Sequence, residues 1–321
     1  MWIAKPVRAL SESELSRFPK DVPLAQTLDW ARAIESLGSK TYAVFETDLA
    51  VGGIVYESQP GRFECVNGPA LHWDDSEKVA AQFSTFVLAV TKLSKNFQAV
   101  TLRPRWPADQ MQSRLLKIPF AVTRVDQAST WVVPVQETWE AQLKLASPRL
   151  RRTLKRAEAL TSVQVTSSEA WVGDALDRFV QAVSDHAKEK SFSVPPTHWF
   201  RSLVQGEGFF SVQAESSFSK TELLIAVQCG RAHYLFGVTQ KKPGSAETQA
   251  RKADSGRDST STVAHFRVLE ELRRQGIQEY DLNGYVTDAK SDHPYFGVAQ
   301  YKKQFGGSTV DYVQAVFEIE A

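Results

Sequence analysis

Hydrophobic residues recur along this chain with two periods, that of an amphipathic helix and that of a half-buried strand. A helix is predicted at 27–37, with Thr27 capping its start and Gly38 ending it. The pattern also predicts strands at 41–47, 50–58, 62–71, 98–104 and 129–135, a helix at 76–94 and a short helix near 107–117. Turn residues separate the first three strands, namely Gly52-Gly53, Pro60-Gly61 and Asn67-Gly68-Pro69.

In the second half of the sequence, the hydrophobic pattern predicts the same succession of elements. It contains helices at 147–160, 169–189, 197–204 and 261–276, strands at 208–216, 221–229, 231–239, 277–284 and 310–319, and a short helix holding 301–307. A tight turn is expected at Gly230. The polar segment 239–262 is expected to form a mobile loop in front of a helix.

This repeated order predicts the fold class, an α+β (mixed α/β) duplication with two similar mixed sheets. The length of 321 residues agrees with it, because such a chain is too long for one small core.

Composition excludes several classes of function. The formal net charge is +1, so a nucleic-acid or membrane contact would have to be a local basic patch. Cys65 and Cys229 match no metal-ligand spacing and the six histidines form no metal-binding motif, so no metal site is expected. The N-terminus lacks a signal-like apolar run, and no stretch approaches the ~20 apolar residues that span a bilayer. A cytoplasmic, reducing location is the simplest expectation.

Six stretches, taken together, resemble the signatures of peptidoglycan bridge-forming aminoacyltransferases, the Fem family. In chain order they are "PLAQTLDWARAI", "NGPAL", "SPRLRRTLKRAEAL" with "SVQV", "YLFGVT", "YDLNG" and "YKKQFGG". The resemblance implies two tandem GNAT-like acyltransferase domains, in the short form of the family that lacks a coiled-coil arm. The first domain is expected at 1–138 plus 309–321 and the second at 139–308.

The resemblance also implies a reaction and its partners. An amino acid esterified to tRNA is passed to an amine on the peptide of a nucleotide-linked (UDP-linked) or lipid-linked peptidoglycan precursor. No cofactor is needed, because the ester is already activated. A monomer is expected, with a transient contact to the inner-membrane surface.

By this resemblance, Lys302 and Tyr301 fall in the transfer site. Aminolysis of an ester passes through a tetrahedral oxyanion, which a nearby cation stabilises. We therefore expect Lys302 to face that oxyanion or the terminal phosphates of the tRNA, and Tyr301 to stack on the terminal adenine. The alternative is an exposed helix end, in which lysines favour the helix dipole and Gly306 stops the helix. Lys303 is assigned to that alternative.

The expected substrate-binding residues are spread along the chain. They are Arg32, Arg103, Trp199, Tyr234, Phe236 and Tyr285. An arginine can hold a phosphate with two hydrogen bonds, whereas Trp199 and Phe236 are equally compatible with a place in the core. Two positions depart from the family pattern: Pro104 replaces a carboxylate proposed as a base, and Pro195 replaces an arginine that binds phosphate. Asp281 and Asp288 are the nearby carboxylates, and neither is assigned the role of base.

The helix predicted at 147–160 carries five cations, and no acidic partner at i+4 spacing neutralises its early arginines. The five cations are Arg149, Arg151, Arg152, Lys155 and Arg156. We interpret them as a surface for the phosphates of tRNA or a nucleotide, and a solvated helix face is the alternative.

Two other functions remain open at this stage. One is an acyl-CoA-dependent N-acyltransferase of polysaccharide or small-metabolite biosynthesis, since "ADSGRDSTST" before a helix weakly resembles a pyrophosphate-binding loop. The other is a non-catalytic binding protein on the same fold, which Pro104 and Pro195 favour.

Overall fold

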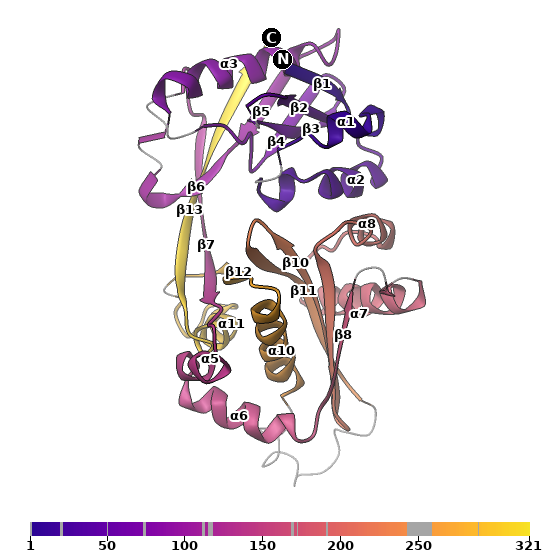
Figure 1. Cartoon of the computed structure of the whole chain (residues 1–321), viewed down its shortest axis with the longest axis vertical. Helices are drawn as coiled ribbons and strands as arrows, with labels where there is room; N and C mark the ends of the chain where they lie inside the picture. The colour runs from indigo at the N-terminus through magenta and orange to yellow at the C-terminus, as the bar shows by residue number, and fades with distance from the viewer. Residues whose placement is uncertain are drawn as a thin grey trace. The chain divides into compact units, whose positions relative to one another are not determined.

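The computed structural model describes residues 2–19, 22–49, 51–72, 75–110, 113–114, 118–167, 170–171, 173–190, 192–242, 259–287 and 289–321. The chain divides into two compact units, and each is described by itself (Figure 1). The first unit comprises Met1–Ala128 with Asp311–Ala321, and the second comprises Ser129–Val310.

The first unit is built around a mixed sheet. Its elements are β1 (Trp2–Pro6), α1 (Glu12–Leu15), α2 (Leu28–Ser36), β2 (Thr41–Glu46), β3 (Val51–Gln59), β4 (Arg62–Val66), α3 (Ser76–Thr91), β5 (Ala99–Arg103), β6 (Arg105–Pro107) and parts of β7 (Arg124–Pro134) and β13 (Ser308–Glu320). The strands follow the order β1-β2-β3-β4-β5-β13, and the neighbours are antiparallel except for the parallel pair β4 and β5.

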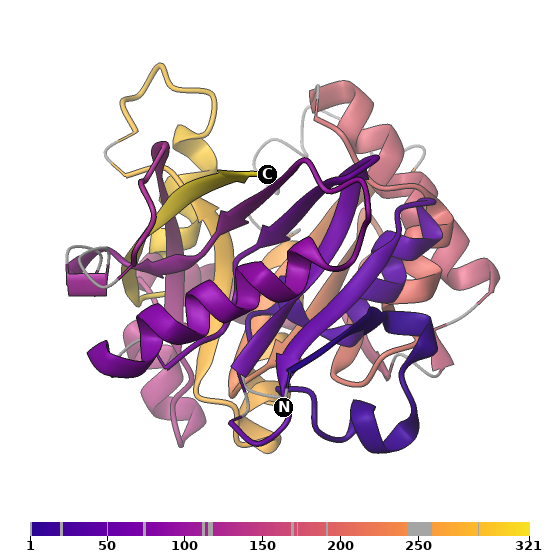
Figure 2. The ribbon, with the colours of Figure 1, turned by 90° about the horizontal axis from the view of Figure 1, so that it is seen from above.

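Helices cover both faces of this sheet because its buried strands are apolar on both faces. On one face α3 crosses the strands (Figure 2), and its Phe83 and Phe86 pack with Phe63 and Val100. On the other face α2 packs its Ala31 among side chains of β2 and β3. As predicted, Thr27 caps α2 by accepting a hydrogen bond from the backbone N–H of Trp30.

The prediction of a turn at Gly52-Gly53 is wrong, because both glycines lie inside β3. A Cβ on Gly52 would lie 2.4 Å from the Val44 carbonyl oxygen, and one on Gly53 would lie 2.7 Å from Oε1 of Gln26. The side chain of Gln26 fills the space beside Gly53: its Oε1 accepts from the backbone N–H of Ile54 at 2.7 Å, and its Nε2 donates to the carbonyl of Val66. The glycines therefore permit close packing within the sheet.

The second unit repeats the succession of elements. Its elements are α5 (Trp139–Leu145), α6 (Pro148–Glu158), β8 (Ser162–Ser167), α7 (Asp174–Lys190), α8 (Thr197–Leu203), β9 (Phe209–Glu215), β10 (Ser219–Gln228), β11 (Arg231–Lys241), α10 (Thr260–Arg274), β12 (Glu279–Tyr285) and α11 (Phe296–Lys303). The order is β8-β9-β10-β11-β12-β7, antiparallel except for the parallel pair β11 and β12. One face of this sheet packs on α10 and α6, and α7 packs on β11.

The last strands of the two units are exchanged along the chain. The strand β7 follows the first-unit elements, yet its residues 129–134 pair with β12 of the second unit. The strand β13 follows the second-unit elements, yet Phe317–Glu320 pair with β5 of the first unit. This pairing explains why the first boundary falls after Ala128 and not after residue 138.

Three other predictions differ from the structure or lie partly outside it. The short helix near 107–117 includes only a 3-10 turn, Ala108–Gln110, in its continuously described part. The helix predicted from residue 169 begins at Asp174. Most of the loop predicted at 239–262 lies outside the described residues, as does Asp288, while 239–241 belong to β11 and 260–262 to α10. Among the described helices, none is long and apolar enough to cross a membrane.

Candidate functional site

An irregular turn within β12, close to the end of the strand, creates the polar centre of the second unit. The register between β12 and β7 shifts between Asp281 and Gly284, and Asn283 adopts a φ of 56°. The carboxylate Oδ1 of Asp281 accepts from the backbone N–H of Asn283 at 2.7 Å, and the Asn283 side-chain amide donates to the carbonyl of Tyr234. Asparagine tolerates this left-handed conformation better than most residues. The carbonyls of Asn283 and Gly284 lie at this irregularity of the strand, within hydrogen-bond reach of α11.

These two carbonyls hold the ammonium group of Lys302. From α11, its Nζ donates to the oxygen of Asn283 at 2.7 Å and to that of Gly284 at 2.6 Å. The residue is 8% exposed, and burial lowers its pKa to about 8, although the charge of Asp281 acts to raise it. Lys302 is therefore mainly protonated at pH 7. Two ammonium hydrogens are used, and within the described part of the chain the third has no partner.

The two lysines of the motif have opposite environments. Burial of Lys302 rules out the exposed helix end for this residue, while its role in transfer stays a prediction. Lys303 is exposed, as expected, and its Nζ lies 5.8 Å from the centre of the Tyr285 ring. That ring is buried and lies 5.0 Å from the ring of Trp131, so Tyr285 contributes to the core beside the motif.

Asp281 provides the negative charge near Lys302. Its side chain is buried, and burial alone would raise its pKa, but the nearby His233 and the hydroxyl of Thr130 outweigh this effect and hold the pKa below its usual value. Thr130 and the Asn283 N–H both donate to Oδ1, and Nδ1 of His233 lies 3.6 Å from Oδ2. The carboxylate is thus surrounded by structural partners, and it orients the turn that holds Lys302.

Tyr301 belongs to a packed aromatic group and not to an open stacking surface. Its ring lies 6.0 Å from that of His265 and 5.2 Å from that of Phe305, and its hydroxyl donates to Oγ of Ser261 at 3.3 Å. Tyr234 packs against the other side chains of this group, with its ring 5.2 Å from His265. Tyr301 and Tyr234 therefore lie on the same face of the sheet as Lys302.

His265 stays neutral in this group. Burial and the charge of Lys302 lower its pKa to about 3, and its Nδ1 shares a hydrogen bond of 2.9 Å with the hydroxyl of Tyr280. Sequence reasoning missed His265, Asn283 and Thr130 as members of the site. The quoted motif "YDLNG" held part of the signal, because an aspartate two residues before an asparagine-glycine pair is typical of a side-chain-capped turn.

The structure separates Trp199 and Phe236 from this group. A bulge changes the register of β11 so that Tyr234 pairs with Ile225 and Phe236 with Leu224. Phe236 consequently faces α8, where its ring lies 6.3 Å from that of Trp199. Trp199 is 3% exposed, so the two side chains form a core on the opposite face from Lys302.

The arginines Arg32 and Arg103 belong to the first unit. Arg32 is an exposed residue of α2 and pairs with Asp29 at 3.0 Å. Arg103 ends β5 and pairs with Glu64 at 3.0 Å, and Glu64 also accepts from the hydroxyl of Tyr56 at 3.1 Å. The Nε of Arg103 is buried and has no hydrogen-bond partner among the described residues, and a role of either arginine in substrate binding stays a prediction.

The five cations of α6 are all exposed. The helix buries Leu150, Leu154 and Ala157, as predicted, and Ser147 caps it by accepting from the N–H of Leu150. Within the described residues, none of the five cations forms an ion pair. The members are Arg149, Arg151, Arg152, Lys155 and Arg156. They remain available for an anionic partner.

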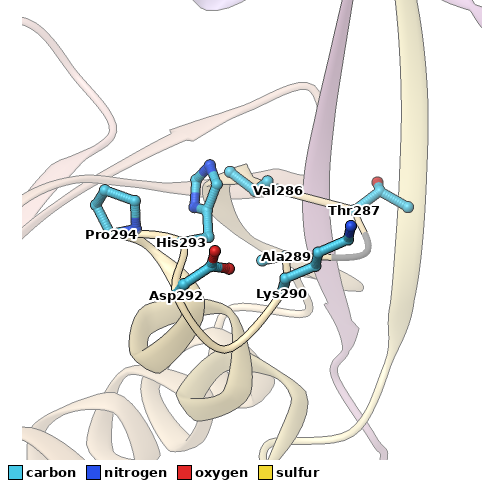
Figure 3. A pocket seen from close by; sticks show the side chains of 7 residues that line it. All are labelled: Val286, Thr287, Ala289, Lys290, Asp292, His293 and Pro294. Carbon is cyan, nitrogen blue, oxygen red and sulfur yellow. The ribbon is translucent and has the colours of Figure 1, made fainter.

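An open pocket of about 390 Å³ lies in the segment that joins β12 to α11 (Figure 3). The residues that line it are Val286, Thr287, Ala289, Lys290, Asp292, His293 and Pro294. The pocket thus lies between the two elements that position Lys302. Within the described residues, no group of three or more His, Cys, Asp or Glu side chains could hold a metal ion.

Comparisons with known proteins identify the fold. No family model matches the chain, and no curated protein matches it. Among solved structures, FemX is similar with a TM-score of 0.71 at 12% sequence identity, over 98% of this chain and 96% of that chain. The fold of this chain is therefore similar to that of FemX. The structure of L-PGS from Bacillus licheniformis is also similar, with a TM-score of 0.56 at 10% identity, over 98% of this chain and 93% of that chain.

The likeness to FemX is one of fold, and it extends over both units. It confirms the expected fold class, a mixed α/β protein, and the Fem-like fold implied by the resemblance. The shared order of strands and helices within the two units agrees with this assignment.

Proposed function

We propose that this protein is an acyltransferase that moves an aminoacyl group from tRNA to an amine on a peptidoglycan precursor peptide. The observation that carries the proposal is the buried ammonium of Lys302, held by two carbonyls with one hydrogen uncommitted among the described residues. A cation in this state costs no reorganisation when negative charge develops beside it. The fold similarity to FemX supports the same reaction class.

In the proposed reaction, the acceptor amine attacks the ester carbonyl and a C–N bond forms. The carbonyl oxygen becomes an oxyanion, to which Lys302 donates its third hydrogen. The C–O bond to the ribose then breaks, and the departing oxygen gains the proton that the amine loses. Asp281 keeps Lys302 charged by raising its pKa, and the cations of α6 supply phosphate contacts for the RNA.

The reaction is tested with purified protein, aminoacylated tRNA and nucleotide-linked or lipid-linked precursors. The expected product is a precursor whose mass has increased by one amino-acid residue. Replacing Lys302 by Met should lower the transfer rate about 10²–10³-fold. Lys303→Met is the matched control, because Lys303 is the exposed neighbour, and it should transfer at nearly the original rate.

Other outcomes support the other two functions. Consumption of an acyl-CoA in place of aminoacyl-tRNA would identify an acyl-CoA-dependent N-acyltransferase. If the protein binds a precursor without modifying it, and Lys302→Met binds equally well, the chain is a binding protein.

A further inference from the structure

The pocket between β12 and α11 presents charges of both signs. Lys290 and Asp292 both line it, together with the ring of His293 (Figure 3). Val286, Ala289 and Pro294 add apolar surface. The volume of about 390 Å³ lies near the lower end of the ~300–1,000 Å³ that ligand pockets occupy, so the pocket suits a small ligand.

The two charges have no partner in the described residues. Lys290 and Asp292 do not pair with each other, although only one residue separates them in sequence. Many surface ion pairs of the second unit do form, such as that of Asp177 with Arg201 and that of Lys188 with Asp185. A ligand that carries both a cationic group and an electron-rich oxygen would therefore satisfy both side chains of the pocket.

His293 is oriented as a hydrogen-bond donor. Its Nδ1 accepts from the backbone N–H of Tyr295 at 3.1 Å, and the two rings lie 5.8 Å apart. Because Nδ1 is an acceptor, the neutral ring carries its proton on Nε2. That N–H is available to a carbonyl or carboxylate oxygen.

We infer that this pocket holds the α-amino acid unit of the donor. Its α-ammonium group binds Asp292, its carbonyl oxygen faces Lys290 or His293, and its side chain lies against the apolar surface. The inference rests on the proposed function. A phosphate would place its charge beside Asp292, and a simple amine would place its charge beside Lys290, so each satisfies only one of the two side chains. An ammonium and a carbonyl on neighbouring carbons satisfy both.

The position of the pocket along the chain supports this assignment. Lys302 holds the carbonyls of Asn283 and Gly284, immediately before the pocket segment, and α11, which carries Lys302, begins immediately after it. Ala289 packs against the same core as Tyr301. An amino acid bound in this pocket would therefore contact the segment between β12 and α11, the two elements that position Lys302.

The test is a binding measurement by NMR with three small probes, which needs neither RNA nor precursor. L-Alanine amide carries the ammonium and a neutral carbonyl, N-acetyl-L-alanine carries only the negative charge, and ethylamine carries only the positive charge. The amide should bind most tightly. Asp292→Asn should raise its dissociation constant about fivefold, as expected for a partly exposed ion pair, while the charge-matched control Asp185→Asn on α7 should leave it unchanged.

The outcomes separate this inference from the proposed function. If N-acetyl-L-alanine or ethylamine binds as tightly as the amide, or if Asp292→Asn binds the amide unchanged, the amino-acid pocket is wrong even when wild-type protein transfers an aminoacyl group. If the amide binds and Asp292→Asn weakens it while wild-type protein performs no transfer, the pocket is right and the proposed reaction is wrong. Lys290→Met provides a second, independent variant of an exposed side chain.

Discussion

Each unit contains one parallel strand pair at the same point in its succession of elements. The pair in the first unit stays paired along its length, whereas the pair in the second unit separates before β12 ends. In the first unit β4 and β5 stay paired from Arg62 and Ala99 to Val66 and Arg103. In the second unit β11 and β12 are paired only as far as His233 and Asp281. Beyond that point β12 turns at Asn283 and its carbonyls meet Lys302.

The side chains explain the difference between the units. At the first pair Phe63, Cys65, Val100 and Leu102 are buried in one apolar cluster, so continued pairing buries mainly apolar side chains. At the second pair a carboxylate, an amide and an ammonium meet in a buried space, and each needs partners that a regular ladder does not supply. The two units therefore share a topology, and the polar site of the second unit arises from a few residues near the end of β12.

The largest expected effect is on the transfer rate, and it comes from changing Lys302, beside the pair β11 and β12 of the second unit. Lys302→Met should reduce transfer about 10²–10³-fold by removing the cation from the oxyanion. Lys302→Arg retains the charge but cannot place a single Nζ between the two carbonyls, so it should recover only part of the rate. Steady-state rates at saturating substrate measure this. Equal rates for Lys302→Met and wild type would remove the functional distinction between the units.

The next effect is on the stability of the first unit, whose parallel pair is β4 and β5. Gln26→Ala removes the acceptor for the Ile54 N–H and a donor to Val66, and we expect a loss of about 2–3 kcal/mol in the free energy of unfolding. Urea unfolding measures it, with the exposed Gln181→Ala as the control. The transfer rate per folded molecule should be unchanged, and a comparable drop in that rate would show that the first unit also contributes to the chemistry.

A smaller effect is expected from the pH dependence of stability. The pKa of Lys302 is about 8 in the folded protein against an ordinary lysine pKa of 10.5, so above pH 8 the folded state loses its proton while the unfolded state keeps it. The cost of burying the charge then disappears, and unfolding should become about 2 kcal/mol harder between pH 7.5 and 9.5.

Chemical denaturation at several pH values measures this slope. Lys302→Met should lack it, whereas Lys303→Met should show it unchanged. A wild-type slope that persists in Lys302→Met would assign the titration to another group.

The smallest effect isolates the backbone of the turn. Asn283→Ala loses the side-chain bond to the Tyr234 carbonyl and strains a positive φ, and it should cost about 1–2 kcal/mol of stability. Asn283→Gly loses the bond but permits the conformation, so it should cost less. Thermal unfolding ranks the two variants, and a reversed ranking would mean that conformational strain contributes little there.

Much of the fold could be predicted from the sequence, because periodicity and capping residues are local signals. Thr27 and Ser147 cap helices as expected, and α6 buries the expected stripe. The glycines of β3 were assigned to a turn because their reason is not local: the backbone of β2 lies against Gly52, and Gln26, far away in sequence, lies against Gly53. Two of the quoted stretches, "PLAQTLDWARAI" and "NGPAL", meet at this point, where a Cβ on Gly68 would also meet Gln26.

The site was less predictable than the fold. Lys302 was singled out through a family resemblance, and its burial depends on Asn283 and Gly284 turning towards it, which the spacing of residues does not reveal. Trp199 and Phe236 were grouped with Tyr234 through the same family resemblance, but the bulge in β11 places Tyr234 and Phe236 on opposite faces of the sheet. A register shift of this kind depends on tertiary pairing, so the sequence carried no signal for it.

The exchange of β7 and β13 has a consequence for synthesis on the ribosome. The first-unit elements up to β5 are synthesised first, yet β13, which covers the edge of β5, emerges only after the second-unit elements. Until then β5 presents an unpaired edge, a surface prone to pairing with other chains. The sheet of the first unit can therefore be completed only after the whole second unit has been synthesised.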